Sequence, residues 1–128
     1  MAEKALCSFE QIMALANPSL IERDAAIQRF EYTFEAVWKA AKQMLYDIYG
    51  FDIGSPKGVV RSCREVGLFD DVQAVGALEM VDDRNLTVHT YNEALASEIF
   101  VRTRYYVTLL RQWVESIKGR MYEHKDGV

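Results

Sequence analysis

The feature that most constrains the fold is an apolar stripe that runs through residues 20–49 without a glycine or proline to interrupt it. Its side chains recur mostly at alternating steps of three and four, at Leu20, Ile27, Phe30, Phe34, Val37, Ala41, Met44 and Ile48. This spacing places them on one face of a long helix. An apolar helical face needs other helices to cover it, so the stripe predicts a bundle.

A second long helix is predicted to begin after Asn92, which can cap it. Its apolar positions again step by three and four, at Ala96, Phe100, Thr103, Val107, Leu110, Val114, Ile117 and Met121. Three shorter helices are expected, over residues 3–16, over residues 56–66, and from Asp70 or Asp71 into the stretch 83–93. The last of these carries Val72, Val75, Leu78 and Val81 as its apolar positions.

Local signals separate these helices. Asn17 and Pro18 end the first helix, and Ser19 can cap the second, because proline disfavours a helical residue before it. Gly50 and Gly67 are placed to end helices, and the pair Ser55-Pro56 is a typical start. With only two prolines and seven glycines in the chain, we predict an all-α, antiparallel helical bundle.

The length of 128 residues suits one core, so residues 1–128 are interpreted as a single domain. No apolar run approaches the length of a membrane helix, and charges interrupt the N-terminal segment where a signal peptide would be apolar; we therefore expect a cytoplasmic protein without membrane association. Cys7 and Cys63 show no disulfide or zinc pattern, so both are expected as reduced thiols, and neither a metal nor a cofactor is predicted.

The net charge is −4, which argues against broad adhesion to nucleic acid but leaves room for a local site. Four arginines of the second half are interpreted as solvated helix faces: Arg102, Arg104, Arg111 and Arg120. The pairs Asp70-Asp71 and Asp82-Asp83 are interpreted as helix-dipole partners or solvated charges. Four aromatic residues are expected to form a second apolar face for a dimer partner: Trp38, Tyr105, Tyr106 and Trp113.

The stretch DRNLTVHTYNE, residues 83–93, collects reactive side chains where a helix should end. Arg84 and His89 would lie about 140° apart on a continuous helix, so a break is needed to bring them together. The segment Leu86-Thr87-Val88 has two β-branched residues that weaken helix formation. If residues 89–91 were extended, His89 and Tyr91 would point to the same side.

The chemistry of this stretch suits a phosphate. An arginine can hold a phosphodiester, and a histidine with a pKa near ~6.5 can exchange a proton with a ribose hydroxyl at neutral pH. Together Arg84 and His89 could cleave RNA without a metal ion. On the residues alone, a histidine that caps a helix or satisfies the core explains such a pair more often.

Three runs carry a resemblance to a known family: QRFEYTFEAVWKAAKQML (28–45), SPKGVVRSCREVGLFDD (55–71) and DRNLTVHTYNEALASEI (83–99). In this order they resemble the bacterial nucleotidyltransferase substrate-binding proteins of the HEPN superfamily, over most of the chain from about Ile21 to the middle of the last helix. The resemblance implies a HEPN-like, up-and-down bundle with a four-helix core, which forms a homodimer and pairs with a separately encoded minimal nucleotidyltransferase.

The resemblance also implies roles for single residues. In related toxin-antitoxin pairs the HEPN member is a metal-independent RNase whose motif is an arginine, four to six residues and a histidine; Arg84 and His89 fit it with four residues between them. Arg84 would bind phosphate, His89 would act as acid and base, and Asn85 would orient the histidine or the substrate. Tyr91 stands two positions after the histidine, where the nucleotidyltransferase adenylylates and silences its toxin.

Three functions follow as hypotheses. The first is an RNase toxin silenced by adenylylation at Tyr91. The alternative is a non-catalytic subunit that binds a nucleotide or another substrate for a two-component nucleotidyltransferase, and the third is a plain dimerisation module. One departure from the family pattern is Gly76-Ala77-Leu78, where an aromatic residue is expected, and this departure predicts looser packing behind the motif.

Overall fold

The computed structural model describes residues 1–126. These residues form five α-helices and one short 3₁₀ turn, with no strand among them: α1 (Ala2–Met13), α2 (Leu20–Tyr49), α3 (Pro56–Glu65), α4 (Asp71–Leu86), η1 (Thr87–His89) and α5 (Glu93–Asp126). The predicted all-α class is confirmed. Helix α1 ends at Met13 rather than at Ala16, because the backbone tightens there and Leu15 N–H donates to Ile12 O at 3.3 Å.

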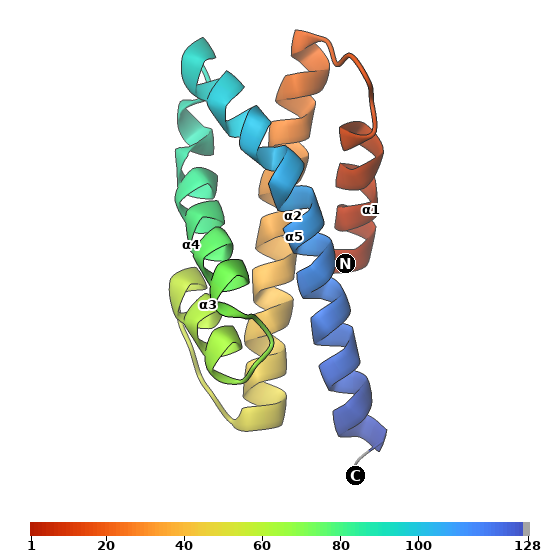
Figure 1. Ribbon diagram of the computed structural model, residues 1–128, viewed down its shortest axis with the longest axis vertical. Coiled ribbons are helices and arrows are strands. Elements are labelled where there is room, and N and C mark those ends of the chain that lie inside the picture. The colour runs from red at the N-terminus through yellow and green to blue at the C-terminus, as the bar shows by residue number, and fades with distance from the viewer. Residues whose placement is uncertain (127–128) are drawn as a thin grey trace.

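The long helices α2 and α5 form the centre of the bundle, with α1 on one side and the α3–α4 pair on the other (Figure 1). Helices α1, α2, α4 and α5 alternate in direction along the chain, which confirms the up-and-down arrangement. None of the helices in residues 1–126 combines the length and hydropathy needed to cross a membrane.

Aromatic rings from three helices meet in the core. The Phe30 ring of α2 stacks on Tyr106 of α5 with centroids 5.4 Å apart, and Phe9 of α1 lies 6.1 Å from Phe30. Tyr106 and Trp113 are buried, so the prediction that both belong to an exposed dimer face is wrong. A tyrosine can be buried when its hydroxyl has a partner, and here Asp83 accepts from Tyr106.

The helix boundaries rest on local hydrogen bonds that the sequence predicted. Ser19 and Glu22 form a capping box at the start of α2, with distances of 2.9 and 3.1 Å. Asp70 caps α4 in the same way, and the Ser55 hydroxyl accepts from Gly58 N at the start of α3. Gly50, with φ 71°, adopts the left-handed conformation that ends α2.

The buried face of α4 agrees with the predicted one at Val81, which is buried, and at Leu78, which packs partly buried against the core, but not at Val72 and Val75. Val72 and Val75 are 75% and 57% exposed, whereas Ala74, Ala77 and Met80 are buried. Small side chains face the bundle because α4 packs closely against its neighbours. Hydrophobicity alone predicts that Val72 and Val75 are buried, but the space available in the folded bundle leaves them exposed.

Gly76 is the tightest point of this packing. A Cβ built there would lie 2.5 Å from the hydroxyl oxygen of Tyr105 on α5. The Tyr105 ring therefore covers the α4 backbone where the sequence lacks an aromatic residue. The expectation of loose packing at Gly76-Ala77-Leu78 is wrong, because the aromatic group comes from another helix.

We predict that Gly76→Ala lowers the free energy of unfolding by about 1 kcal/mol, since the cost of pushing the Tyr105 ring away exceeds the gain of alanine in helix propensity. The matched control is Gly119→Ala on α5, where an added Cβ meets nothing within 4 Å. This control should raise the free energy of unfolding by roughly 0.5–1 kcal/mol, through helix propensity. Urea unfolding measures both values, and equal stabilisation by the two substitutions would contradict the packing at Gly76.

Candidate functional site

The connection between α4 and α5 is the candidate site. Helix α4 ends at Leu86, the 3₁₀ turn η1 follows, and α5 begins at Glu93. Asn92 caps α5, with its Oδ1 accepting from Leu95 N at 3.1 Å, and Asn92 N donates to His89 O at 3.1 Å. The predicted break between Arg84 and His89 is therefore present. We call residues 84–92 the α4–α5 bend.

The bend exposes three of the predicted site residues, Asn85, His89 and Tyr91. His89 is exposed, and the Tyr91 side chain is 83% exposed. Their ring centroids lie 6.0 Å apart, with the rings nearly perpendicular. The segment between them is a turn, not a strand, because Thr90 has φ −74° and ψ 2°. The condition of an extended backbone is therefore not met, yet the turn still places the two rings beside each other.

Arg84 lies in the last turn of α4 and faces α2. Its Nε is 2.7 Å from Glu35 Oε1, and each of the two side chains is 30% exposed. The Nε atom is shielded from solvent and makes no regular hydrogen bond, so this close contact is best described as a charge pair. Asn85, the next residue, is exposed. No spacing along α2 marks Glu35 as the partner of Arg84, because only the packing of α4 on α2 brings the two together.

A second carboxylate of α2, that of Glu31, also reaches the bend. The Thr87 hydroxyl lies 3.1 Å from Glu31 Oε2 and 2.7 Å from the carbonyl oxygen of Arg84. Glu31 and Glu35 are four positions apart, which is about one helical turn. Helix α2 therefore contacts the bend at two points, one turn apart.

Asp83 anchors the bend from the other side. It is only 5% exposed, and its carboxylate accepts from Arg102 Nε at 2.6 Å, from Arg102 Nη2 at 2.9 Å and from the Tyr106 hydroxyl. Burial, together with the nearby Asp83 carboxylate, raises the pKa of Tyr106 well above its usual range. The hydrogen bond to Asp83 raises the pKa of Arg102. This network joins the end of α4 to α5.

The interpretation of Asp83 as a solvated or helix-dipole charge is therefore wrong, as is that of Arg102 as a solvated face. A signal was present, because Asp83 continues the buried steps of three at Ala74, Ala77 and Met80. Its neighbour Asp82 is exposed and pairs with Lys57 at 2.8 Å. Adjacent aspartates thus play different roles, since they point to different faces of α4.

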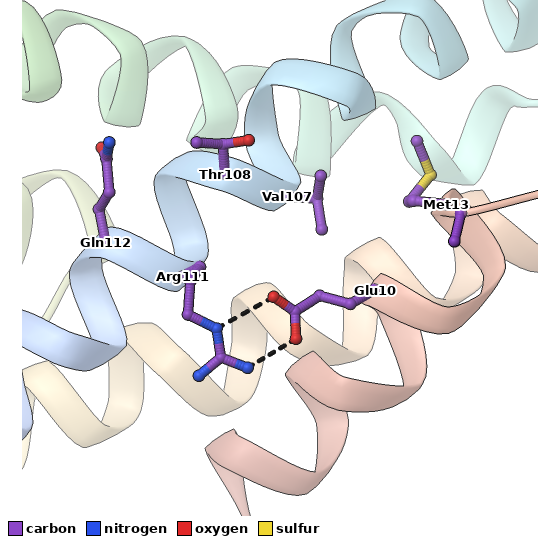
Figure 2. Close-up of a pocket in the computed structure, with 7 residues that line it drawn as sticks. Glu10, Met13, Val107, Thr108, Arg111 and Gln112 are labelled. Carbon is purple, nitrogen blue, oxygen red and sulfur yellow. Dashed lines mark hydrogen bonds and ion pairs between the residues drawn. The ribbon is translucent and has the colours of Figure 1, made fainter.

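A groove between α1 and α5 holds another arginine that was expected to be solvated. Figure 2 shows the Arg111 guanidinium facing Glu10 across this groove, with contacts of 2.6 and 3.0 Å. Arg111 Nη1 also lies 2.8 Å from Glu3 and 2.9 Å from Glu115. These hydrogen bonds, that of Glu10 first, raise the pKa of Arg111. Three carboxylates surround this charge, so Arg111 ties α1 to α5.

Arg120 also has a structural role. Its Nη1 donates to the Tyr49 hydroxyl and, at 3.0 Å, to the carbonyl oxygen of Val66. The expectation of a solvated side chain is wrong here too, because Arg120 joins α5 to the end of α2 and to the residue that follows α3. Arg104 is exposed, with its guanidinium carbon 5.6 Å from the Phe100 ring centroid.

The resemblance of the chain to known proteins extends over nearly its whole length. The family described as nucleotidyltransferase substrate binding protein like matches residues 1–119. The chain belongs to this family. Among curated proteins, none matches it.

Two solved structures resemble this member of the substrate-binding family. A protein from Thermus thermophilus is 56% identical, with a TM-score of 0.88 over 91% of this chain and 98% of that chain. A Haemophilus influenzae protein is 23% identical, with a TM-score of 0.77 over 91% of this chain and 96% of that chain. Its structure is described as revealing the fold of a substrate binding domain of a nucleotidyltransferase. At this identity the likeness shows the fold alone.

We predict that Asp83→Ala lowers the free energy of unfolding by roughly 2–4 kcal/mol, because it leaves Arg102 and Tyr106 without their shared acceptor. Asp82→Ala is the matched control at the next position, where an exposed pair contributes about 0–1 kcal/mol. Urea unfolding followed by circular dichroism compares the two variants. Equal losses at both positions would show that the buried network does not hold α4 to α5.

Proposed function

We propose that this chain is the partner subunit of a separately encoded minimal nucleotidyltransferase, and that it presents the α4–α5 bend to that enzyme. The observation that carries the proposal is the exposure of Tyr91, at 83%, beside the ring of His89. An acceptor hydroxyl must enter the active site of another protein, so it has to project from the surface. The family description supports a role beside a nucleotidyltransferase.

The chemistry proposed for the bend is adenylyl transfer to Tyr91. The Tyr91 oxygen bonds to the α-phosphorus of ATP, the bond to the β-phosphate oxygen breaks, and pyrophosphate leaves. The phenolic proton passes to a base, for which His89 is the nearest imidazole, with ring centroids 6.0 Å apart. Arg84 then binds a phosphate of the nucleotide or of an RNA ligand, and Asn85 orients that ligand.

The second candidate is the metal-independent RNase toxin of the HEPN type. It is favoured by the position of Arg84 and the exposed His89 on the same bend. Here His89 takes the proton of a ribose 2′-hydroxyl, the 2′-oxygen bonds to phosphorus, the bond between phosphorus and the 5′-oxygen breaks, and the protonated His89 returns a proton to the leaving 5′-oxygen. Arg84 holds the phosphate. An adenylyl group on Tyr91 would place a competing phosphate near both residues and silence the cleavage.

The binding subunit is our first choice because the charge of Arg84 is already paired with Glu35. A phosphodiester must therefore compete with that carboxylate for the charge of Arg84. The same pairing is compatible with a subunit that binds its ligand reversibly.

The test is co-expression with the minimal nucleotidyltransferase that we expect the neighbouring gene to encode, and then measurement of the intact mass of this chain. We predict added adenylyl mass that Tyr91→Phe abolishes and Tyr122→Phe retains, since Tyr122 is also exposed, at 69%, but lies far along α5. Unmodified protein would overturn the proposal. Growth of cells that express the chain alone separates the candidates: arrest that His89→Ala relieves supports the RNase, and normal growth supports the binding subunit.

The proposal includes a homodimer. Exposed apolar side chains lie on α4 at Val72 and Val75, and on α5 at Val101 and the half-exposed Tyr105, next to Gly76. We call these four the α4–α5 apolar face. Pairing of this face with its copy would be isologous and would cover it from water.

We predict a dimer at micromolar concentration by light scattering, and a monomer for Val75→Glu, since a buried charge opposes pairing. Leu20→Glu is the control, because Leu20 is 65% exposed on α2 and lies outside this face. A monomeric parent protein would contradict the homodimer, and a dimeric Val75→Glu variant would place the interface elsewhere.

A further inference from the structure

The carboxylate of Glu35 is surrounded by donors. Arg84 Nε lies 2.7 Å from its Oε1, while Trp38 Nε1 donates to Oε2 at 3.3 Å and Lys39 Nζ lies 3.7 Å from Oε2. Three positive or polar groups from two helices thus converge on one negative group. An anionic ligand that binds Arg84 would share its guanidinium with this carboxylate, so the two negative groups would compete for one positive charge.

The pair of Glu35 and Arg84 is stronger than a pair on an open surface. Both side chains are 30% exposed, and the Arg84 Nε is shielded from solvent. Charges attract more strongly where water is partly excluded. A phosphate must therefore compete with Glu35 in order to bind Arg84.

Glu35 keeps other partners when a phosphate binds Arg84. Trp38 and Lys39 contact the other carboxylate oxygen and remain when Arg84 turns to a ligand. The bend itself does not depend on Glu35 alone, since Glu31 contacts Thr87 and Asp83 contacts Arg102. Release of Arg84 is therefore a local change.

We infer that Glu35 is a specificity-determining residue that competes with phosphate for Arg84 and so sets the affinity of the bend for phosphate ligands. The inference rests on the part of the proposed function that assigns phosphate binding to Arg84. It adds that the Glu35 carboxylate, on α2, lowers the affinity of the bend for phosphate ligands.

The test is a titration with AMP in which the NMR signal of the Arg84 Nε–H group reports binding and gives the Kd. Glu35→Gln should tighten the Kd for AMP about two- to fivefold, the range expected for loss of a partly exposed ion pair. Glu31→Gln is the matched control one turn away and should leave the Kd unchanged. The double variant Glu35→Gln with Arg84→Ala should not show this tighter binding of AMP.

An unchanged or weaker Kd in a folded Glu35→Gln variant would overturn the inference, as would an equal gain for adenosine, which has no phosphate. Trp38→Phe provides a second variant: it removes a donor that holds the far oxygen of Glu35, so this carboxylate depends more on Arg84 and AMP should bind more weakly. No change in the Kd of this variant would also count against the competition.

These results are separate from those for the proposed function, because no nucleotidyltransferase is present in the titration. Tighter AMP binding without adenylylation of Tyr91 would overturn only the partner-enzyme proposal. Adenylylation of Tyr91 without tighter AMP binding by Glu35→Gln would overturn only the inference about Glu35.

Discussion

The buried carboxylate of Asp83 is the constraint on which this end of the bundle depends. A buried charge is costly unless its partners replace water, and Arg102 and Tyr106 do so from α5. Asp83 directly precedes Arg84 in the chain. The network that satisfies Asp83 therefore also determines where α4 ends relative to α5 and which way Arg84 faces.

Helix α2 completes the arrangement from the opposite side. Glu31 and Glu35, one turn apart, contact Thr87 and Arg84. The bend is thus held by α5 through Asp83 and by α2 through two carboxylates, while His89 and Tyr91 remain exposed. A rigid support with exposed reactive side chains suits a surface that another protein or a phosphate ligand must reach.

Helix starts and ends could be predicted because their causes are local. The Ser19 capping box and the left-handed Gly50 involve residues only a few positions apart. The buried face of α4 could be predicted only in part by hydrophobicity, because Val72 and Val75 are more apolar than the Ala74 and Ala77 that pack inside. The partners that Arg111 finds on α1 lie about a hundred positions away in the chain, so no local pattern marks them.

The sequence by itself determined the helical class, the two long apolar stripes and the break between Arg84 and His89, because periodicity and capping act over one or two helical turns. Only the tertiary structure decided that Asp83 is buried, that Glu35 pairs with Arg84 and that Tyr105 covers Gly76. Each of these joins residues of different helices. Such contacts depend on how closely the helices pack, which is a property of the whole bundle.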